Sequence, residues 1–187
     1  MTPLSVCVFC GSKTGGNPAY AEAAETLGRT LAAEGWRLVY GAGDIGLMGL
    51  VARANQQAGG NNFGVIPQHL MDLEAGKRDL NALVITETMH ERKKVMFSNS
   101  HAIVLLPGGA GSLDEFFEVL TWAQIGLHGR PIFVVNTDGY WTPLLGLIDH
   151  VVAEGFAHES VRDLFQTVPD IAALTEALRP LAAELKS

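Results

Sequence analysis

The chain has 187 residues, of which 48% are hydrophobic, so it is long enough to form one ordinary domain with a buried core. Acidic residues outnumber basic ones by 20 to 13, and the net charge of -7 argues against binding to a nucleic-acid backbone. No apolar run approaches the roughly 20 residues of a membrane-spanning helix, and no cationic leader precedes the first apolar run, so we expect a cytoplasmic protein without membrane contact.

Short β-rich runs alternate with helical patterns along the sequence. The expected strands cover residues 6–9, 37–40, 62–66, 83–86, 103–106, 132–136 and 165–168. The expected helices cover residues 18–34, 47–58, 91–99, 113–125, 142–154 and 171–185. This alternation indicates a parallel sheet with right-handed crossovers. We predict one α/β domain over residues 1–187, a Rossmann-like parallel sheet of about seven strands with helices on both faces, in which the irregular segment 68–80 forms a lid or a dimer contact.

Cys7 and Cys10 form a C-x-x-C pattern at the first expected strand. A redox pair usually opens a helix, whereas a separation of three residues along a strand places the two side chains on opposite faces of the sheet. We therefore interpret them as buried, reduced thiols. Six histidines are scattered without the spacing of metal ligands, so we expect no metal and no cofactor.

Residues 41–46 match the pattern G-x-G-x-x-G between a strand and a helix. The match is weak as a dinucleotide-binding signal, because the next expected strand ends at Pro67 without the acidic residue that would hold an adenosine ribose. We interpret this turn, through Gly43, as bringing the backbone close to a mononucleotide. Gly11 and Ser12 in the first turn are expected to approach the same ligand.

A run of charged residues, Met89-His-Glu-Arg-Lys-Lys94, follows the fourth expected strand. Open α/β sheets bind ligands at the carboxyl ends of their strands, so Arg92 and Lys93 are expected to face phosphate and sugar, beside Met89. The alternative is a solvated helix face on which Glu91 balances Lys94.

The most informative stretch leads from the fifth expected strand through a glycine-rich turn into a helix. Gly108, Gly109 and Gly111 can adopt backbone conformations in which successive N–H groups converge on an anion at the positive end of the helix. Ser112 would add a hydroxyl to this phosphate cradle.

Two carboxylates, Asp114 and Glu115, lie in the first turn of the same expected helix. Because they would repel a phosphate, at least one of them is expected to face another part of the ligand, which indicates phosphosugar chemistry. In the alternative, Ser112 and Glu115 form a capping box and Glu115 is purely structural.

The expected helix after this turn carries more large apolar side chains than one buried face requires. They are Phe116, Phe117, Leu120, Trp122 and Ile125. A well-buried helix and a homodimer interface both account for them.

Seven motifs recur in this order in one known family: Cys10-Gly-Ser12, Val39-Tyr-Gly-Ala-Gly43, Gly46-Leu-Met-Gly49, Gly64-Val-Ile-Pro67, Met89-His-x-Arg-Lys93, Pro107-Gly-Gly-x-Gly-Ser-x-x-Glu115 and Thr121-Trp-x-Gln-x-Gly126. Together they resemble the LOG ("Lonely Guy") proteins, cytokinin riboside 5′-monophosphate phosphoribohydrolases, over nearly the whole chain. The resemblance implies a LOG-like nucleotide-binding domain and a homodimer. It also implies hydrolysis of the N-glycosidic bond of a nucleoside 5′-monophosphate to a free base and ribose 5-phosphate, with Arg92 and Glu115 as the catalytic pair.

The sequence departs from the usual family pattern at four positions. Ser112 and Asp114 stand where Thr and Glu are common, and each keeps the chemical group. His101 replaces a frequent Asp and Ala42 interrupts a turn that is usually all glycine, so these two are expected to alter packing or base preference. Members of the family also carry the label lysine decarboxylase, which this sequence does not support because none of its lysines has a recognisable cofactor-linking context.

Two alternatives remain open from the sequence. One is a broader purine or pyrimidine mononucleotide nucleosidase. The other is a non-catalytic binding protein like the molybdenum-cofactor carriers, which share this type of fold. The combination of Arg92 and Glu115 favours an enzyme, since a carrier has no chemical need for it.

Overall fold

The computed structural model describes residues 3–71, 73, 76 and 79–186. Its strands are β1 (Ser5–Phe9), β2 (Arg37–Tyr40), β3 (Asn61–Pro67), β4 (Ala82–Thr86), β5 (Ala102–Leu105), β6 (Ile132–Val135) and β7 (Gln166–Val168). Its α-helices are α1 (Pro18–Ala33), α2 (Gly46–Gln57), α3 (Met89–Ser98), α4 (Ala110–Gln124), α5 (Thr142–Ala153) and α6 (Ile171–Glu184). The chain also forms short 3-10 helices, η1 (Gln68–Leu70), η2 (Thr137–Gly139) and η3 (Glu159–Leu164).

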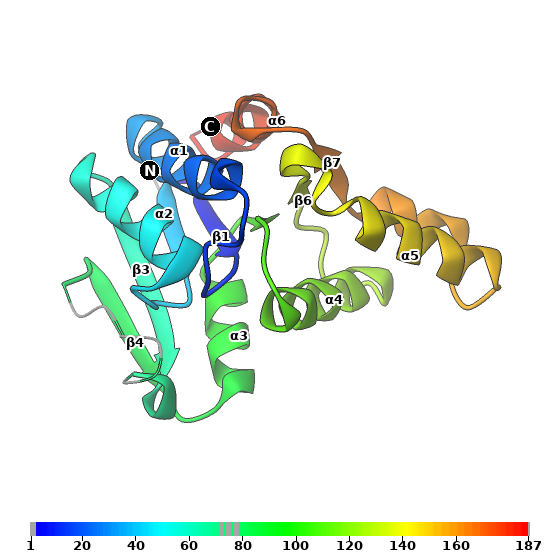
Figure 1. Ribbon diagram of the computed structural model, residues 1–187, viewed down its shortest axis with the longest axis horizontal. Helices are drawn as coiled ribbons and strands as arrows, with labels where there is room; N and C mark the ends of the chain where they lie inside the picture. Colours follow the sequence, from blue (N-terminus) through cyan, green and yellow to red (C-terminus); the bar gives the residue numbers. More distant parts are fainter. Residues whose placement is uncertain (1–2, 72, 74–75, 77–78, 187) are drawn as a thin grey trace.

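The seven strands form one sheet in the order β4-β3-β2-β1-β5-β6-β7, and every neighbouring pair is parallel. The predicted parallel α/β sheet with helices on both faces is therefore confirmed, and element ends differ from the expected ones by at most three residues. Figure 1 shows α1, α2 and α6 along one side of the sheet and α3 and α4 along the other. Part of the segment expected to act as a lid or dimer contact lies outside the described residues.

Two hydrophobic clusters cover the two faces of the sheet. β1 contributes to both, because alternate side chains point to opposite faces: Val6 and Val8 pack with α1, α2 and α6, and Phe9 packs with α4 and α5. Cys10 belongs to the first cluster and Cys7 to the second, and both thiol side chains are buried. The interpretation of the C-x-x-C pattern as two buried thiols on opposite faces is confirmed.

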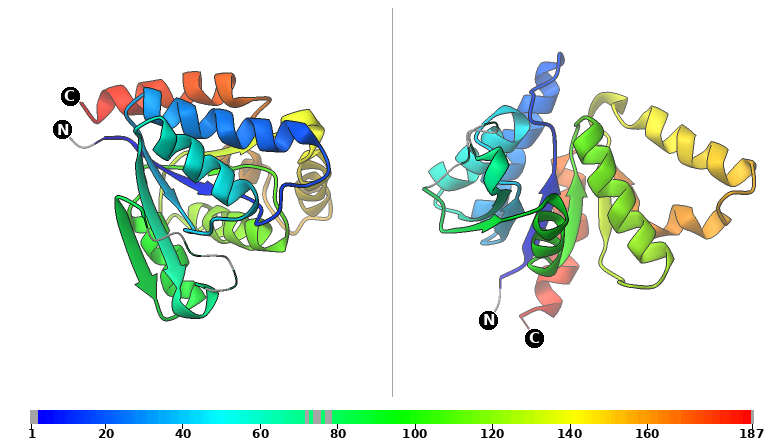
Figure 2. Two further views of the ribbon diagram at one scale, coloured as in Figure 1. Left: turned by 60° about the vertical axis from the view of Figure 1, so that its left-hand side comes forward. Right: turned by 90° about the horizontal axis from the view of Figure 1, so that it is seen from below.

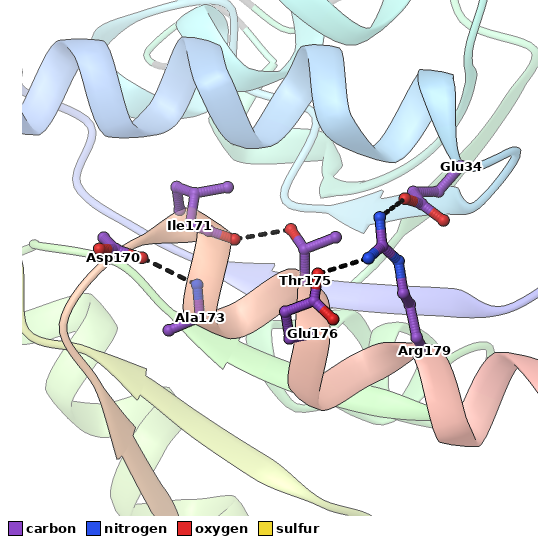
Figure 3. Close-up of polar contacts among 7 residues, drawn as sticks. All are labelled: Glu34, Asp170, Ile171, Ala173, Thr175, Glu176 and Arg179. Atoms are coloured by element: carbon purple, nitrogen blue, oxygen red, sulfur yellow. Dashed lines mark hydrogen bonds and ion pairs between the residues drawn. The ribbon is translucent and has the colours of Figure 1, made fainter.

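The C-terminal helix α6 packs beside α1, as the turned views in Figure 2 and the close-up in Figure 3 show. Asp170 caps its first turn by accepting a 2.8 Å hydrogen bond from the backbone N–H of Ala173. Further along, Arg179 pairs with Glu176 of its own helix and, at 2.8 Å, with Glu34 at the end of α1. The contact between Arg179 and Glu34 joins α6 to α1 in the helical layer on the face of the sheet away from α3 and α4.

The order of the strands reverses between the neighbours β1 and β5: β2 to β4 follow one another on one side of β1, and β5 to β7 on the other. From β1 the chain passes to α1 on one face, and from β5 it passes to α4 on the other (Figure 1). A crevice therefore opens outside the carboxyl ends of these two strands, at the position where open α/β sheets bind their ligands.

Candidate active site

The turns after β1 and β5 pack against each other at two glycines. The N–H of Gly11 donates to the carbonyl of Pro107 at 3.0 Å. A Cβ atom on Gly108 would lie 2.0 Å from the hydroxyl of Ser112 and 3.0 Å from the nitrogen of Gly11. This close approach explains the need for glycine at both positions and joins the two sides of the crevice.

Helix α4 presents its amino end to the crevice. Its N-cap is Gly109, which offers no side chain to the first-turn N–H groups. A Cβ atom on Gly109 or Gly111 would meet no heavy atom within 4 Å, so open space lies beside both residues. Uncapped N–H groups at the positive end of a helix favour an anion, which agrees with the predicted phosphate cradle.

The capping-box interpretation of Ser112 and Glu115 is wrong. Helix α4 begins at Ala110, so Ser112 lies inside its first turn and cannot be the residue that caps it. The capping box occurs instead on α3, where Thr88 accepts a 3.2 Å hydrogen bond from the N–H of Glu91, and Glu91 accepts one from the N–H of Thr88. The T-x-x-E pattern formed by Thr88 and Glu91 is the sequence signal for this capping box at the start of α3.

Arg92 is buried, with 4% of its surface exposed, so the solvated-face interpretation is wrong for this residue. Its Nη2 atom donates to the carbonyl of Gly41 at 2.7 Å and its Nε atom to that of Val65 at 3.2 Å. A Cβ on Gly41 would lie 2.1 Å from Nη2, so the glycine after β2 makes room for the guanidinium. Backbone carbonyls just after β2 and within β3 thus set the orientation of Arg92.

Arg92 and Glu115 line one cavity of about 210 Å³ together with the open end of α4. The turns after β1 and β5 and the first turns of α4 form one part of its wall, with Gly11, Ser12, Gly109, Ala110, Gly111, Ser112 and Asp114. An apolar part is formed by Cys10, Met48, Leu70 and Met89. Sequence reasoning did not name Met48 and Leu70 as site residues, although Met48 lies in the Gly46-Leu-Met-Gly49 motif and Leu70 in the irregular segment 68–80.

A second cavity of about 360 Å³ adjoins the first and shares Gly11, Ser12 and Gly109 with it. The ring of Tyr20 meets that of Tyr140 edge to face with their centroids 5.1 Å apart, and the hydroxyl of Tyr140 donates to the carbonyl of Gly108. Neither tyrosine is identifiable from the sequence, since they come from α1 and from the turn before α5.

Most of the predicted site residues meet at this crevice. Gly11, Ser12, Met89, Arg92, Gly109, Gly111, Ser112 and Glu115 line the first cavity, and Gly108 lines the second. Gly43 and Lys93 do not line either cavity as far as the chain is described. Gly43 instead forms a β-bridge with Gly76. The pKa of Lys93 is lowered by burial, but hydrogen bonds to Asp114 and Glu118 outweigh this effect and raise it.

The fold and the site together define a class: Rossmann-like proteins with a small-ligand crevice at the point where the strand order reverses. The model of the family described as "Possible lysine decarboxylase" matches residues 48–178. A cytokinin riboside 5′-monophosphate phosphoribohydrolase of Arabidopsis thaliana is 43% identical over 173 residues, which cover 92% of this chain and 76% of the relative. One from Rhodococcoides fascians is 41% identical over 95% of this chain and 90% of its own length. The chain belongs to this family, the LOG phosphoribohydrolases.

Solved structures show the same fold at lower sequence identity. The molybdenum cofactor carrier protein of Chlamydomonas reinhardtii superimposes with a TM-score of 0.71 at 20% identity, over 97% of this chain and 99% of the carrier. The molybdenum cofactor binding protein of Rippkaea orientalis gives 0.73 at 19% identity, over 97% and 98%. At this level of identity the likeness establishes the fold alone.

Proposed function

We propose that this protein hydrolyses the N-glycosidic bond of a nucleoside 5′-monophosphate, with N6-modified AMP as the expected substrate and a free cytokinin base and ribose 5-phosphate as products. The observation that carries the proposal is the cavity in which Arg92 and Glu115 face the same space as the amino end of α4. The names of relatives at 41–46% identity support the same reaction.

In this proposal the 5′-phosphate lies at the amino end of α4, held by the N–H groups and hydroxyl of residues 109–112. When the glycosidic bond breaks, its electron pair leaves with the base and C1′ of the ribose gains positive charge. The carboxylate of Glu115 attracts that charge more strongly in the transition state than in the substrate. Water then delivers a hydroxyl group to C1′, and its proton neutralises the departing base.

Arg92 supplies fixed positive charge in the same cavity. Because two backbone carbonyls orient its guanidinium, little of its conformational entropy remains to be lost when substrate binds. It neutralises phosphate or assists the departing base. The apolar side chains of Met48, Leu70 and Met89 form the wall on which the base would pack.

The protein is also proposed to act as a homodimer. Of the apolar residues on α4, Phe116 and Leu120 belong to the core and Trp122 packs against Phe97 of α3. Phe117 and Ile125 are exposed, which leaves apolar surface for a second copy.

Among the described residues, none of the helices combines the length and the apolar character that a membrane span requires. The cytoplasmic location stays a prediction.

The test is base release, followed chromatographically, from AMP, N6-isopentenyl-AMP, the two matching ribosides and nucleoside monophosphates with other bases. Monophosphates should be cleaved, and ribosides should have specificity constants at least about a hundredfold lower, because several charge-assisted hydrogen bonds to phosphate go unmade. Equal cleavage of riboside and monophosphate would contradict the phosphate cradle. Binding without base release would favour a carrier, and equal cleavage of unrelated nucleoside monophosphates a broader nucleosidase.

A further inference from the structure

Lys93 lies at a junction between α3 and α4. Its Nζ atom is 3.0 Å from a carboxylate oxygen of Asp114 and 3.0 Å from one of Glu118. Only 8% of the Lys93 side chain is exposed. Because Asp114 and Glu118 are four residues apart on one helix, they face the same direction and hold the ammonium group together.

The position of this junction along both helices is informative. Lys93 directly follows Arg92 on α3, and Asp114 directly precedes Glu115 on α4. The two helices also touch further from the cavity, where the rings of Phe97 and Trp122 meet with centroids 5.2 Å apart. The ion pairs therefore join the helices at the level of Arg92 and Glu115, and the aromatic contact joins them about one turn away.

The charges explain why an acidic residue can stand beside a phosphate cradle. Asp114 lines the cavity, and its carboxylate would repel an anionic substrate if it were not neutralised. The ammonium of Lys93 supplies that neutralisation from behind the cavity wall. Two of its three N–H donors are already engaged by carboxylates, so it is poorly suited to bind the phosphate itself.

We propose that Lys93 is a positioning residue, which fixes the spacing between Arg92 and Glu115 by holding α3 to the first turns of α4, rather than a residue that contacts the substrate. The inference rests on the proposed hydrolase function. A small shift of a catalytic group can lower turnover by up to about a hundredfold even when substrate binding persists.

The test compares Lys93→Met with the neighbouring control Lys94→Met, which removes an exposed charge from the same helix. Lys93→Met should lower kcat about tenfold or more for AMP, with KM changing less than about threefold. Adenosine cleavage should fall by the same factor, so the preference for monophosphate over riboside should not change. Lys94→Met should retain wild-type kcat, and Lys93→Arg should recover part of the lost turnover.

Each other outcome has a defined meaning. A loss of monophosphate preference in Lys93→Met would show that Lys93 contacts the phosphate and would overturn the proposal. Unchanged kcat, or a kcat that returns to normal once the folded fraction is measured by circular dichroism, would assign Lys93 to stability alone and overturn it as well. Failure of the hydrolase proposal is distinguishable, because the wild-type protein would then release no base.

Discussion

Glu115 is the residue at which charge can be separated from structure with the smallest chemical change. Glu115→Gln keeps the shape and hydrogen-bonding capacity of the side chain but removes the negative charge. We expect turnover of AMP to fall by about two orders of magnitude or more, with the thermal midpoint nearly unchanged. Base release under saturating substrate measures this effect. Near-normal turnover in the variant would mean that the carboxylate does not stabilise the transition state.

We expect His101 to make the stability of the protein depend on pH. The N–H of Ser5 donates to Nδ1 of His101 at 3.0 Å, which requires the neutral ring. Burial, and then the charges of Arg130 and Arg37, lower the pKa of His101 from its ordinary value of 6.5. The folded state therefore binds a proton less readily than the unfolded chain, and the free energy of unfolding decreases as pH falls below about 6.5.

The matching variant is His101→Asn, whose amide oxygen can accept the same hydrogen bond but cannot titrate. Thermal midpoints measured between about pH 8 and pH 5.5 should decline less steeply for this variant than for the wild type. Parallel declines would show that His101 does not contribute. His101 directly precedes β5, at the amino ends of the strands, whereas the crevice lies at their carboxyl ends. Having His101 where the family often has Asp therefore affects packing at that end of the sheet and not the cavity wall.

Single residues differ in how well sequence alone predicts their roles. The glycines after β5 are predictable, because a glycine-rich turn between a strand and a helix is typical of an anion site. The orientation of Arg92 is not, because its partners Gly41 and Val65 are 51 and 27 residues away in sequence. The ion pairs of Lys93 with Asp114 and Glu118 are not predictable either, because these partners are also distant in sequence. Ala42 stands out in the sequence as a departure from the family pattern, but only the structure shows that its φ is 57°.

At the scale of elements, Gly108 and Gly111 at the start of α4 have different roles. A Cβ on Gly111 meets nothing within 4 Å and alanine favours a helix over glycine by about 1 kcal/mol, so Gly111→Ala should not lower the thermal midpoint. KM for AMP should rise about tenfold or more if the added methyl group displaces the phosphate. Gly108→Ala should instead destabilise the fold, by about 1–3 kcal/mol, because Ser112 and Gly11 occupy the space.

Thermal melts and steady-state kinetics on this pair of variants separate fold from binding. A Gly111→Ala protein with wild-type KM would argue against a phosphate beside that residue. Likewise, a Gly108→Ala protein that is as stable as the wild type would show that the turn can relax away from Ser112.

Element positions are predictable where hydrophobic periodicity is strong, and their ends are less so. The expected start of α4 is three residues late, because a Ser-x-x-Glu pattern suggests a cap that the helix does not use. The expected start of α3 is two residues late, because its capping box lies at Thr88 and Glu91, ahead of the charged run. In both cases local patterns alone cannot decide which residue ends the extended backbone.

At the scale of the whole molecule, topology follows from general rules. Alternating strands and helices leave few arrangements other than a parallel sheet covered on both faces, and the ligand crevice then falls where the strand order reverses. The quaternary structure does not follow from these rules, because an apolar helix face can pack inside the molecule or against a second copy. On α4 both situations occur, because some of its apolar side chains are buried in the core and others are exposed.

The exposed part continues onto α5 and the segment after it, which extend away from the sheet in Figure 1. A cleft of about 220 Å³ runs between α4 and α5, with Phe117, Leu147 and Phe156 among its lining residues. Phe156 is 86% exposed, an unfavourable state for so large a ring unless a partner covers it. We therefore expect a homodimer that buries this face, with about 800 Å² or more covered on each copy.

The prediction is tested by light scattering coupled to size exclusion. The wild type should have the mass of two 20.0 kDa chains, and Phe156→Asp should shift the equilibrium to monomer because it would bury an unpaired charge in the interface. The control is Ile85→Asp, which alters another exposed apolar residue, on the distant strand β4, and should stay dimeric. A monomeric wild type would refute the dimer. A dimer that persists in Phe156→Asp and in Leu147→Asp would place the interface on another face.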